Sequence, residues 1–323
     1  MSSILTALTP SFGQAENDLE TVDLDSNIIT ASPFVKHKAE LVVSASEFSG
    51  ATLRRISKSS LGATLSDQAG LHSTYYGPGA GRPVIRGFDG DRIRILNQGM
   101  DTFDVSQTSP DHGVSIEPLF ADKIEVVRGP ASLLYGNAAI GGVVNVIGKE
   151  LPRQRALIPI SGQAEAFYGS VSDEKSYAMA LQGGEGNFAW SAGFLDRQSN
   201  DIEIPGFAES TYQMEAEEHD EDEHHDEDED HEEGEEHENE HGDEEEVFGV
   251  LENSFVDTQS GYLGLAWFSN NGSLALSYSD YSTDYGVPGH SHGHEDEHHD
   301  EDEHEEEESV KINLDQSRFS LRG

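Results

Sequence analysis

The sequence contains no cysteine, which removes thiolate metal ligands, disulfide bonds and cysteine nucleophiles at once. It also lacks any apolar run of about 18 residues, so a transmembrane helix is excluded while a membrane β-barrel is not. Basic residues are scarce, with 19 Lys and Arg against 63 Asp and Glu. A chain this acidic, without a basic patch, would be repelled by phosphate backbones, so we expect no nucleic acid among its partners.

Catalytic patterns are missing as well. There is no paired-carboxylate, Ser/His/Asp or HExxH arrangement, and the glycine-rich stretch 136–142 is not followed by Gly-Lys-Ser/Thr or by a helical pattern. We therefore expect a protein that is not an enzyme, with no catalytic cofactor and no nucleotide site.

Two runs built almost wholly from Asp, Glu and His dominate what is present, at 215–246 and 290–308. They hold 12 of the 15 histidines and 33 of the acidic residues, and outside them the chain has 30 acidic residues against 19 basic ones. Carboxylates attract any cation, and imidazole nitrogen adds a preference for zinc, nickel, cobalt or copper. The candidate metal-capturing histidines are His219, His224, His225, His231, His237, His241, His290, His292, His294, His298, His299 and His304.

The alternative for these runs is plain solvation, because blocks of like charge are usually disordered. Glutamate alone would solvate equally well, so the histidines favour metal capture. Their spacing agrees, since His290, His292 and His294 share one face of an extended chain, while His237 and His241 are one helical turn apart. We expect loops that bind several metal ions without a fixed geometry, and imidazole protonation should weaken them below about pH 6.

Composition divides the chain into segments. Residues 1–38 are polar and carry a short apolar stretch at 3–15, which is either the remnant of a signal peptide or a disordered leader, followed by a flexible tether. Residues 42–150 have a mixed α/β pattern. Short helices are predicted around Ile56, Leu61 and Leu65, strands at 92–96, 124–127 and 143–147, and a tight turn at 97–99.

Several motifs of this segment resemble one known family. The chain resembles the plug domain of TonB-dependent outer-membrane receptors in three separated motifs that occur in the family's order: AELVVSAS, VIRGFDGDRIRILNQGMD and IEVVRGPASLLYGNAAIGGVVNVI. Within that family it resembles the zinc-uptake subfamily. One departure is Asn97-Gln98, where the family more often has Asp before Gly, a change that keeps turn chemistry. The resemblance implies an α+β plug domain lodged in a large antiparallel transmembrane β-barrel of the outer membrane of a Gram-negative bacterium.

The resemblance also implies partners. Residues 39–45 resemble the TonB box, with Glu40, Leu41, Val42 and Val43 at its centre. Such an extended, β-branched segment beside a tether can add a strand to the sheet edge of TonB, which transmits energy from its inner-membrane complex. The alternative is that 39–45 is simply the first strand of the plug.

After Pro152 apolar residues alternate with small or polar ones. Strands are predicted at 160–169, 176–183, 187–197, 259–269, 273–284 and 310–321, and 155–323 is interpreted as the first part of the barrel. A soluble β-sandwich shares the alternation and stays open. Six strands cannot close around a plug, since plugged barrels have roughly 22, so we expect further strands and a barrel surrounded by outer-membrane lipid.

Strand parity locates the two runs. Antiparallel strands alternate in direction, so the connections at 198–258 and 286–309 emerge on the same side, opposite the short turns near 183–187 and 269–272. Outer-membrane barrels keep short turns in the periplasm and long loops outside. Both runs are therefore predicted to be extracellular.

A transport site needs a small, closed set of ligands, and the candidate is SPDHGV, with Asp111 and His112. Receptors of the zinc subfamily use such a pair in the plug, completed by ligands from the barrel. An ordinary capped turn is the alternative. The sequence thus predicts a receptor for TonB-dependent uptake of zinc or a similar divalent metal. Two alternatives are a receptor for a chelate such as a siderophore, haem or cobalamin, and an extracellular or periplasmic metal-binding protein without a transport role.

Overall fold

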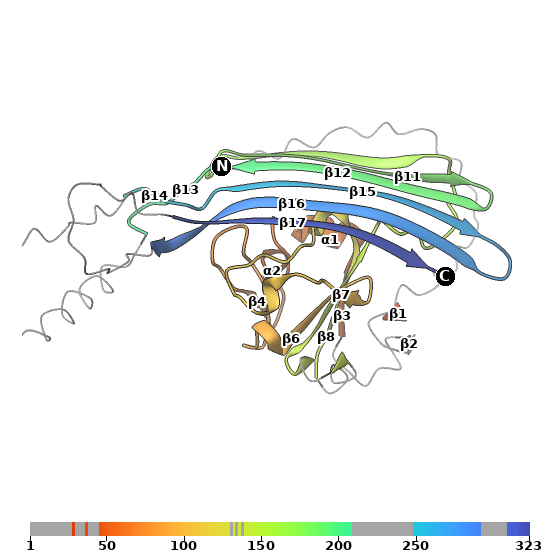
Figure 1. Cartoon of the computed structure of the whole chain (residues 1–323), viewed down its shortest axis with the longest axis horizontal. Helices are drawn as coiled ribbons and strands as arrows, with labels where there is room; N and C mark the ends of the chain where they lie inside the picture. Colours follow the sequence, from red (N-terminus) through yellow and green to blue (C-terminus); the bar gives the residue numbers. More distant parts are fainter. Residues whose placement is uncertain are drawn as a thin grey trace, which may run out of the picture.

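The computed structural model describes residues 28–29, 36–37, 45–129, 132, 135–136, 139–208, 248–291 and 309–323, with the backbone only at 28–29, 36–37 and 290–291. Two parts are visible (Figure 1). An α+β part within residues 45–150, which we call the plug, lies against the concave side of a six-stranded antiparallel sheet, which we call the wall. The predicted fold class, a plug followed by antiparallel barrel strands, is confirmed, while the predicted domain limits stay predictions.

The plug is organised around a five-stranded mixed sheet of order β3-β8-β9-β6-β7, in which only β6 and β9 run parallel. The sheet strands are β3 (Ala45–Ser49), β6 (Ile93–Asn97), β7 (Met100–Asp101), β8 (Ala121–Val127) and β9 (Gly142–Gly148). The remaining plug elements are α1 (Gly50–Ile56), α2 (Leu61–Leu65), β4 (Leu71–Ser73), β5 (Pro83–Ile85), η2 (Gly90–Arg92), η3 (Val105–Gln107) and η4 (Pro118–Phe120). A separate pair, β1 (Ile28–Ile29) and β2 (Lys36–His37), precedes them.

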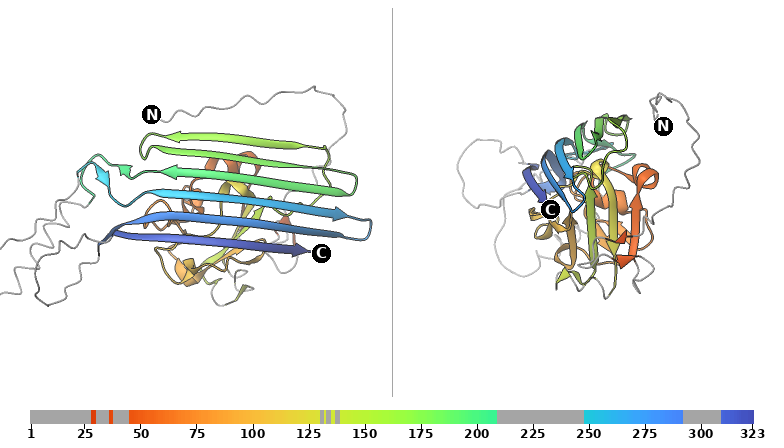
Figure 2. Two further views of the ribbon diagram at one scale, coloured as in Figure 1. Left: turned by 45° about the horizontal axis from the view of Figure 1, so that its top comes forward. Right: turned by 90° about the vertical axis from the view of Figure 1, so that its right-hand side faces the viewer.

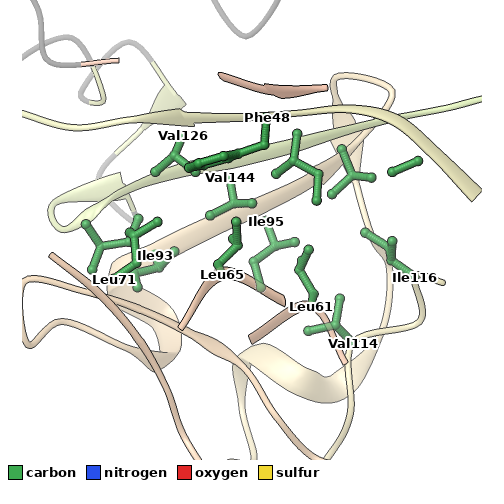
Figure 3. Packing of buried hydrophobic residues seen from close by; sticks show 14 of the residues in the cluster. Phe48, Leu61, Leu65, Leu71, Ile93, Ile95, Val114, Ile116, Val126 and Val144 are labelled. Atoms are coloured by element: carbon green, nitrogen blue, oxygen red, sulfur yellow. The ribbon is translucent and has the colours of Figure 1, made fainter. Parts of the chain in front are cut away.

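The plug has a hydrophobic core between its sheet and its short helices (Figure 3). Leu65, Leu71, Ile124 and Val144 are fully buried there, and each such side chain stabilises the fold by about 1.5–3 kcal/mol. Helix α2 begins where Ser60 accepts a hydrogen bond from the Ala63 amide at 3.2 Å, a regular N-cap. Short helices and the three strands predicted for this region are present as α1, α2, β6, β8 and β9.

The predicted tight turn is also present. Strands β6 and β7 are joined through Gln98 and Gly99, both with positive φ, 58° and 84°. A two-residue hairpin with this backbone follows the twist of its strands. Gly99 also donates its amide to the Asn145 side chain at 2.9 Å, which ties the turn to the centre of the sheet.

The wall is a meander of order β10-β11-β12-β15-β16-β17 (Figure 2). Every pair is antiparallel, and the short turns β11–β12 and β15–β16 share one end, as predicted from parity. A small hairpin of β13 and β14 stands at the other end, between β12 and β15. The elements are β10 (Ser161–Gly169), β11 (Glu174–Glu185), β12 (Phe188–Ser199), β13 (Ile202–Glu203), β14 (Val250–Leu251), β15 (Val256–Phe268), β16 (Ser273–Ser291) and β17 (Ser309–Arg322).

The two faces of the wall have inverted polarity. Toward the plug the wall buries small polar side chains such as Ser191, Thr258 and Ser277, each 2–3% exposed. Its outer face carries Leu263 and Leu265, which are 63% and 64% exposed. A soluble sandwich would bury its apolar face, whereas a barrel in lipid displays it. The sandwich alternative is therefore wrong.

No helix in the described part of the chain combines the length and the apolarity that crossing a membrane requires.

Candidate metal site

Asp111 and His112 lie in the plug loop between η3 and η4, at the contact with the wall. The imidazole Nδ1 of His112 is 3.0 Å from Oδ1 of Asp111, and the two side chains are 30% and 27% exposed. Ser109 donates its hydroxyl to the same carboxylate oxygen, and the His112 amide donates to the Ser109 carbonyl at 3.3 Å. The pair predicted from the sequence is thus a hydrogen-bonded, half-buried unit.

This hydrogen bond decides which atoms can bind a ligand. Because the Asp111 carboxylate accepts a hydrogen bond from Nδ1, the proton of the neutral imidazole is on Nδ1. The lone pair of Nε2 is then free to bind a metal, which is the arrangement found around histidine-bound metals. Oδ1 of Asp111 is occupied by Ser109 and His112. Nε2 is therefore the side-chain atom of this pair that is free to bind a cation in this arrangement, while Asp111 orients the ring.

The Asp111 carboxylate is ionised over a wide pH range. Burial alone would raise the pKa of Asp111, but hydrogen bonds from Ser109 and His112 lower it below its ordinary value of 3.8. Because the pKa of Asp111 is lowered in the folded protein, these hydrogen bonds contribute fully to stability at any pH above the ordinary pKa of the carboxyl group. That contribution is lost as the pH falls through the lowered pKa. Asp111 thus keeps its charge at any mildly acidic pH.

A tyrosine of the wall holds this loop. Tyr285 of β16 is fully buried, accepts a hydrogen bond from the Gly113 amide at 2.8 Å and donates one to the Asp111 carbonyl at 3.0 Å. The sequence reasoning missed it. One signal existed, because Tyr285 is a large side chain on a face of β16 where Ala275, Ser277 and Thr283 are small, although Tyr281 on that face is also large.

A second contact between plug and wall is ionic. Arg197 of β12 donates to Glu117 of the plug at 3.0 and 3.3 Å, and both side chains are almost fully buried. Glu117 also accepts the Leu119 amide at 3.0 Å, which caps η4. On β17, Gln316 donates to the Thr102 carbonyl at 2.9 Å. The loop with Asp111 and His112 is therefore bounded by wall contacts on several sides.

Most of the other predicted site residues lie outside the described residues. These are the TonB-box residues Glu40, Leu41, Val42 and Val43 and the loop histidines from His219 to His241 and from His292 to His304. His290 is placed by its backbone alone, at the end of β16. Among the described residues, no three His, Cys, Asp or Glu side chains form a metal-binding group.

The segments that flank the two runs meet at one end of the wall. Asn253, just after β14, donates its side-chain amide to the Val287 carbonyl at 3.0 Å and to the Val310 carbonyl at 2.7 Å. Val287 and Val310 flank the second run, and β13 and β14 flank the first. Tyr285 lies on β16 six residues before its end at Ser291, so Asp111 contacts the wall near the end where these flanking segments meet.

Comparisons with known proteins agree with this architecture. The model of the TonB-dependent Receptor Plug Domain matches residues 37–143. The Vitamin B12 transporter BtuB of Vibrio cholerae is 25% identical over 186 residues, which are 57% of this chain and 29% of the relative. The Ferrioxamine B receptor of Salmonella typhimurium is 31% identical over 101 residues, 31% of this chain and 13% of the relative.

Solved structures share the fold. The Copper transporter OprC superposes with a TM-score of 0.54 at 18% identity, over 72% of this chain and 29% of that one. The FpvAI-pyocin S2 complex gives 0.54 at 14% identity, over 81% of this chain and 29% of the matched one. Identities this low show the fold alone.

Residues 37–143 therefore contain a plug domain of the kind found in TonB-dependent receptors, and the chain shares its fold with the solved structures named above. The chain spans 29% of the length of the Vibrio relative. None of the relatives named above is described as a zinc transporter.

Proposed function

We propose that this chain is the plug and first barrel strands of a receptor that takes up a metal-containing substrate with energy from TonB. The plug match and the inverted polarity of the wall support a transporter. Residues 40–43 are proposed to be the segment that binds TonB, because their β-branched, proline-free sequence suits strand addition and they precede β3, the first described strand of the plug sheet.

The first candidate substrate is a free divalent cation, with zinc foremost. The observation that carries it is the hydrogen bond between Asp111 and His112, which orients the imidazole ring and leaves its Nε2 free to bind a metal. One such ligand does not complete a zinc site, which takes four. The remaining ligands would come from residues outside the described ones. The His/acid-rich runs would raise the local metal concentration above this pair.

The second candidate is a metal chelate, and the relatives favour it. They are described as a vitamin B12 transporter and a ferrioxamine B receptor. A feature of the plug agrees, because Tyr75 is 60% exposed next to Tyr76, which packs at the Tyr285 end of the wall. An exposed aromatic ring suits the flat or apolar surface of a chelate more than a bare ion.

One experiment separates the candidates. The receptor carrying Asp111→Ala with His112→Ala is expressed in its outer membrane, and uptake of radioactive zinc is measured beside uptake of labelled cobalamin and ferrioxamine. The cation candidate predicts loss of zinc uptake at every concentration and no chelate uptake in the parent. Chelate uptake by the parent, with zinc uptake unaffected by the substitutions, would establish the second candidate and remove the first. Ser106→Ala, in a neighbouring part of the same plug loop region, is the control.

A further inference from the structure

The Tyr285 hydroxyl contacts the backbone on both sides of His112. It accepts from the amide that follows His112 in the chain and donates to the carbonyl that precedes it, at 2.8 and 3.0 Å. These are the two peptide groups whose orientation sets the direction of the His112 side chain. Tyr285 of the wall therefore fixes the backbone of His112, the residue whose Nε2 is free to bind a metal.

The hydroxyl itself is held in place by packing. The Tyr285 ring lies in a buried apolar cluster with Ala80, Val256 and Val287, and Tyr76 packs against it. Gly79 admits the ring, because a Cβ there would lie 2.5 Å from the Tyr285 Cγ atom. Gly113 likewise allows its loop to lie close to Gly79, because a Cβ added to Gly113 would lie 2.5 Å from the Gly79 carbonyl oxygen. A ring enclosed on all these sides cannot change its rotamer without moving the plug.

We infer that Tyr285 is the positioning residue of the plug metal pair. This inference rests on the cation candidate of the proposed function. Donor groups bind a metal tightly when neighbouring hydrogen bonds hold them in the binding geometry beforehand. Asp111 orients the imidazole ring through Nδ1, and Tyr285 orients the backbone from which that ring projects. The barrel wall thus contributes to metal affinity without contributing a ligand.

A purely structural tie between plug and wall would look similar in a static structure. The two roles differ in what they control. A structural tie lowers the amount of folded receptor when it is removed, whereas a positioning bond lowers the affinity of each folded receptor. The metal concentration that gives half-maximal uptake does not depend on the number of receptors, so it separates the roles.

The test is Tyr285→Phe, which keeps the ring in its cluster and deletes only the hydroxyl. Tyr278→Phe is the matched control, since Tyr278 is on the same strand but faces outward, with its hydroxyl 3.2 Å from Asp280. Zinc uptake is measured across concentrations with both variants in the outer membrane, together with heat-modifiable migration and receptor abundance. We expect Tyr285→Phe to raise the half-saturating zinc concentration about 10-fold. Tyr278→Phe should leave it unchanged.

An unchanged half-saturating concentration for Tyr285→Phe overturns the inference, whether abundance is normal or reduced. The proposed function is tested separately by the Asp111→Ala, His112→Ala receptor in the same assay. If that receptor takes up zinc normally, the cation candidate fails. If it loses uptake while Tyr285→Phe behaves as the parent, only the positioning role of Tyr285 fails.

Discussion

Glu117 of the plug and Arg197 of the wall form a two-bonded ion pair that is shielded from solvent, with nitrogen to oxygen distances of 3.0 and 3.3 Å. Their side chains are 1% and 5% exposed. Glu174 of β11 lies 3.5 Å from the same guanidinium, so Arg197 is surrounded by two carboxylates. A buried charge is tolerated only with such partners.

Breaking this pair should loosen the plug from the wall. Glu117→Gln keeps an oxygen that can cap Leu119 but removes the charge, and we expect a loss of about 3–5 kcal/mol in the free energy of unfolding. Thermal unfolding of the purified receptor measures it. The control is Lys175→Ala, which removes an exposed ion pair with Asp173 and should change nothing measurable. Adding Arg197→Met to Glu117→Gln should recover part of the loss, and a further loss would contradict this account.

The outer face of the wall should tolerate charge poorly. Leu265→Arg places a cation on the apolar face of β15, where we expect a cost of about 2–4 kcal/mol near the bilayer midplane. Receptor abundance in outer membranes and heat-modifiable migration report the result. Gln259→Arg, on the same face of β15 and six residues nearer its start, is the matched control and should cost much less. Equal abundance of both variants would argue against a lipid-facing surface at Leu265.

If residues 40–43 bind TonB, a substitution there should stop uptake of the substrate without stopping its binding at the cell surface. Val42→Pro removes a backbone donor and disfavours the extended pairing that strand addition requires. We expect energised uptake to be abolished while cells still bind the substrate at their surface. Surface binding and uptake are measured on the same cells, with Ser26→Pro in the preceding tether as the control. Full uptake by the Val42→Pro receptor would show that 40–43 does not bind TonB.

The His/acid-rich runs predict metal capture that depends on pH. A peptide of residues 215–246 should bind zinc at pH 7.5 and lose most of it below about pH 6, because protonated imidazole cannot bind metal. Isothermal titration across this pH range measures it. A peptide with all six histidines changed to Gln should bind much more weakly at pH 7.5. Equal binding by both peptides would assign capture to the carboxylates alone.

Much of the wall could be predicted because alternation and turn spacing are local properties of a sequence. The predicted strand 259–269 corresponds to β15, Val256–Phe268, and 310–321 to β17, Ser309–Arg322. The largest difference is at β16, predicted to end at 284 but continuing to Ser291. Gly286, Pro288 and Gly289 argue against a strand by propensity. The strand continues there with an irregular register, because Gly286 pairs with Lys311, Ser291 pairs with Ser309, and Asn253 donates to the Val287 carbonyl between them.

The site could be predicted only in part. Asp111 and His112 are adjacent in sequence, so their motif can be recognised, and the structure places them in contact. Tyr285 is 172 residues away from Gly113, and Arg197 is 80 residues from Glu117. Such pairs depend on how the wall wraps the plug, which no local pattern encodes. The metal role of Asp111 and His112 stays a prediction.

The small hydroxyl side chains on the concave side of the wall have a consequence for movement. Ser191 donates its hydroxyl to the Glu150 carbonyl of the plug at 3.2 Å, and a bond to water can replace such a bond at little net cost. Apolar packing instead resists separation in proportion to its area, and it joins plug and wall in clusters such as that of Phe120 with Leu195 and Tyr262. Displacing the plug therefore costs little where hydroxyl side chains face it and most at these clusters and at the pair of Glu117 with Arg197.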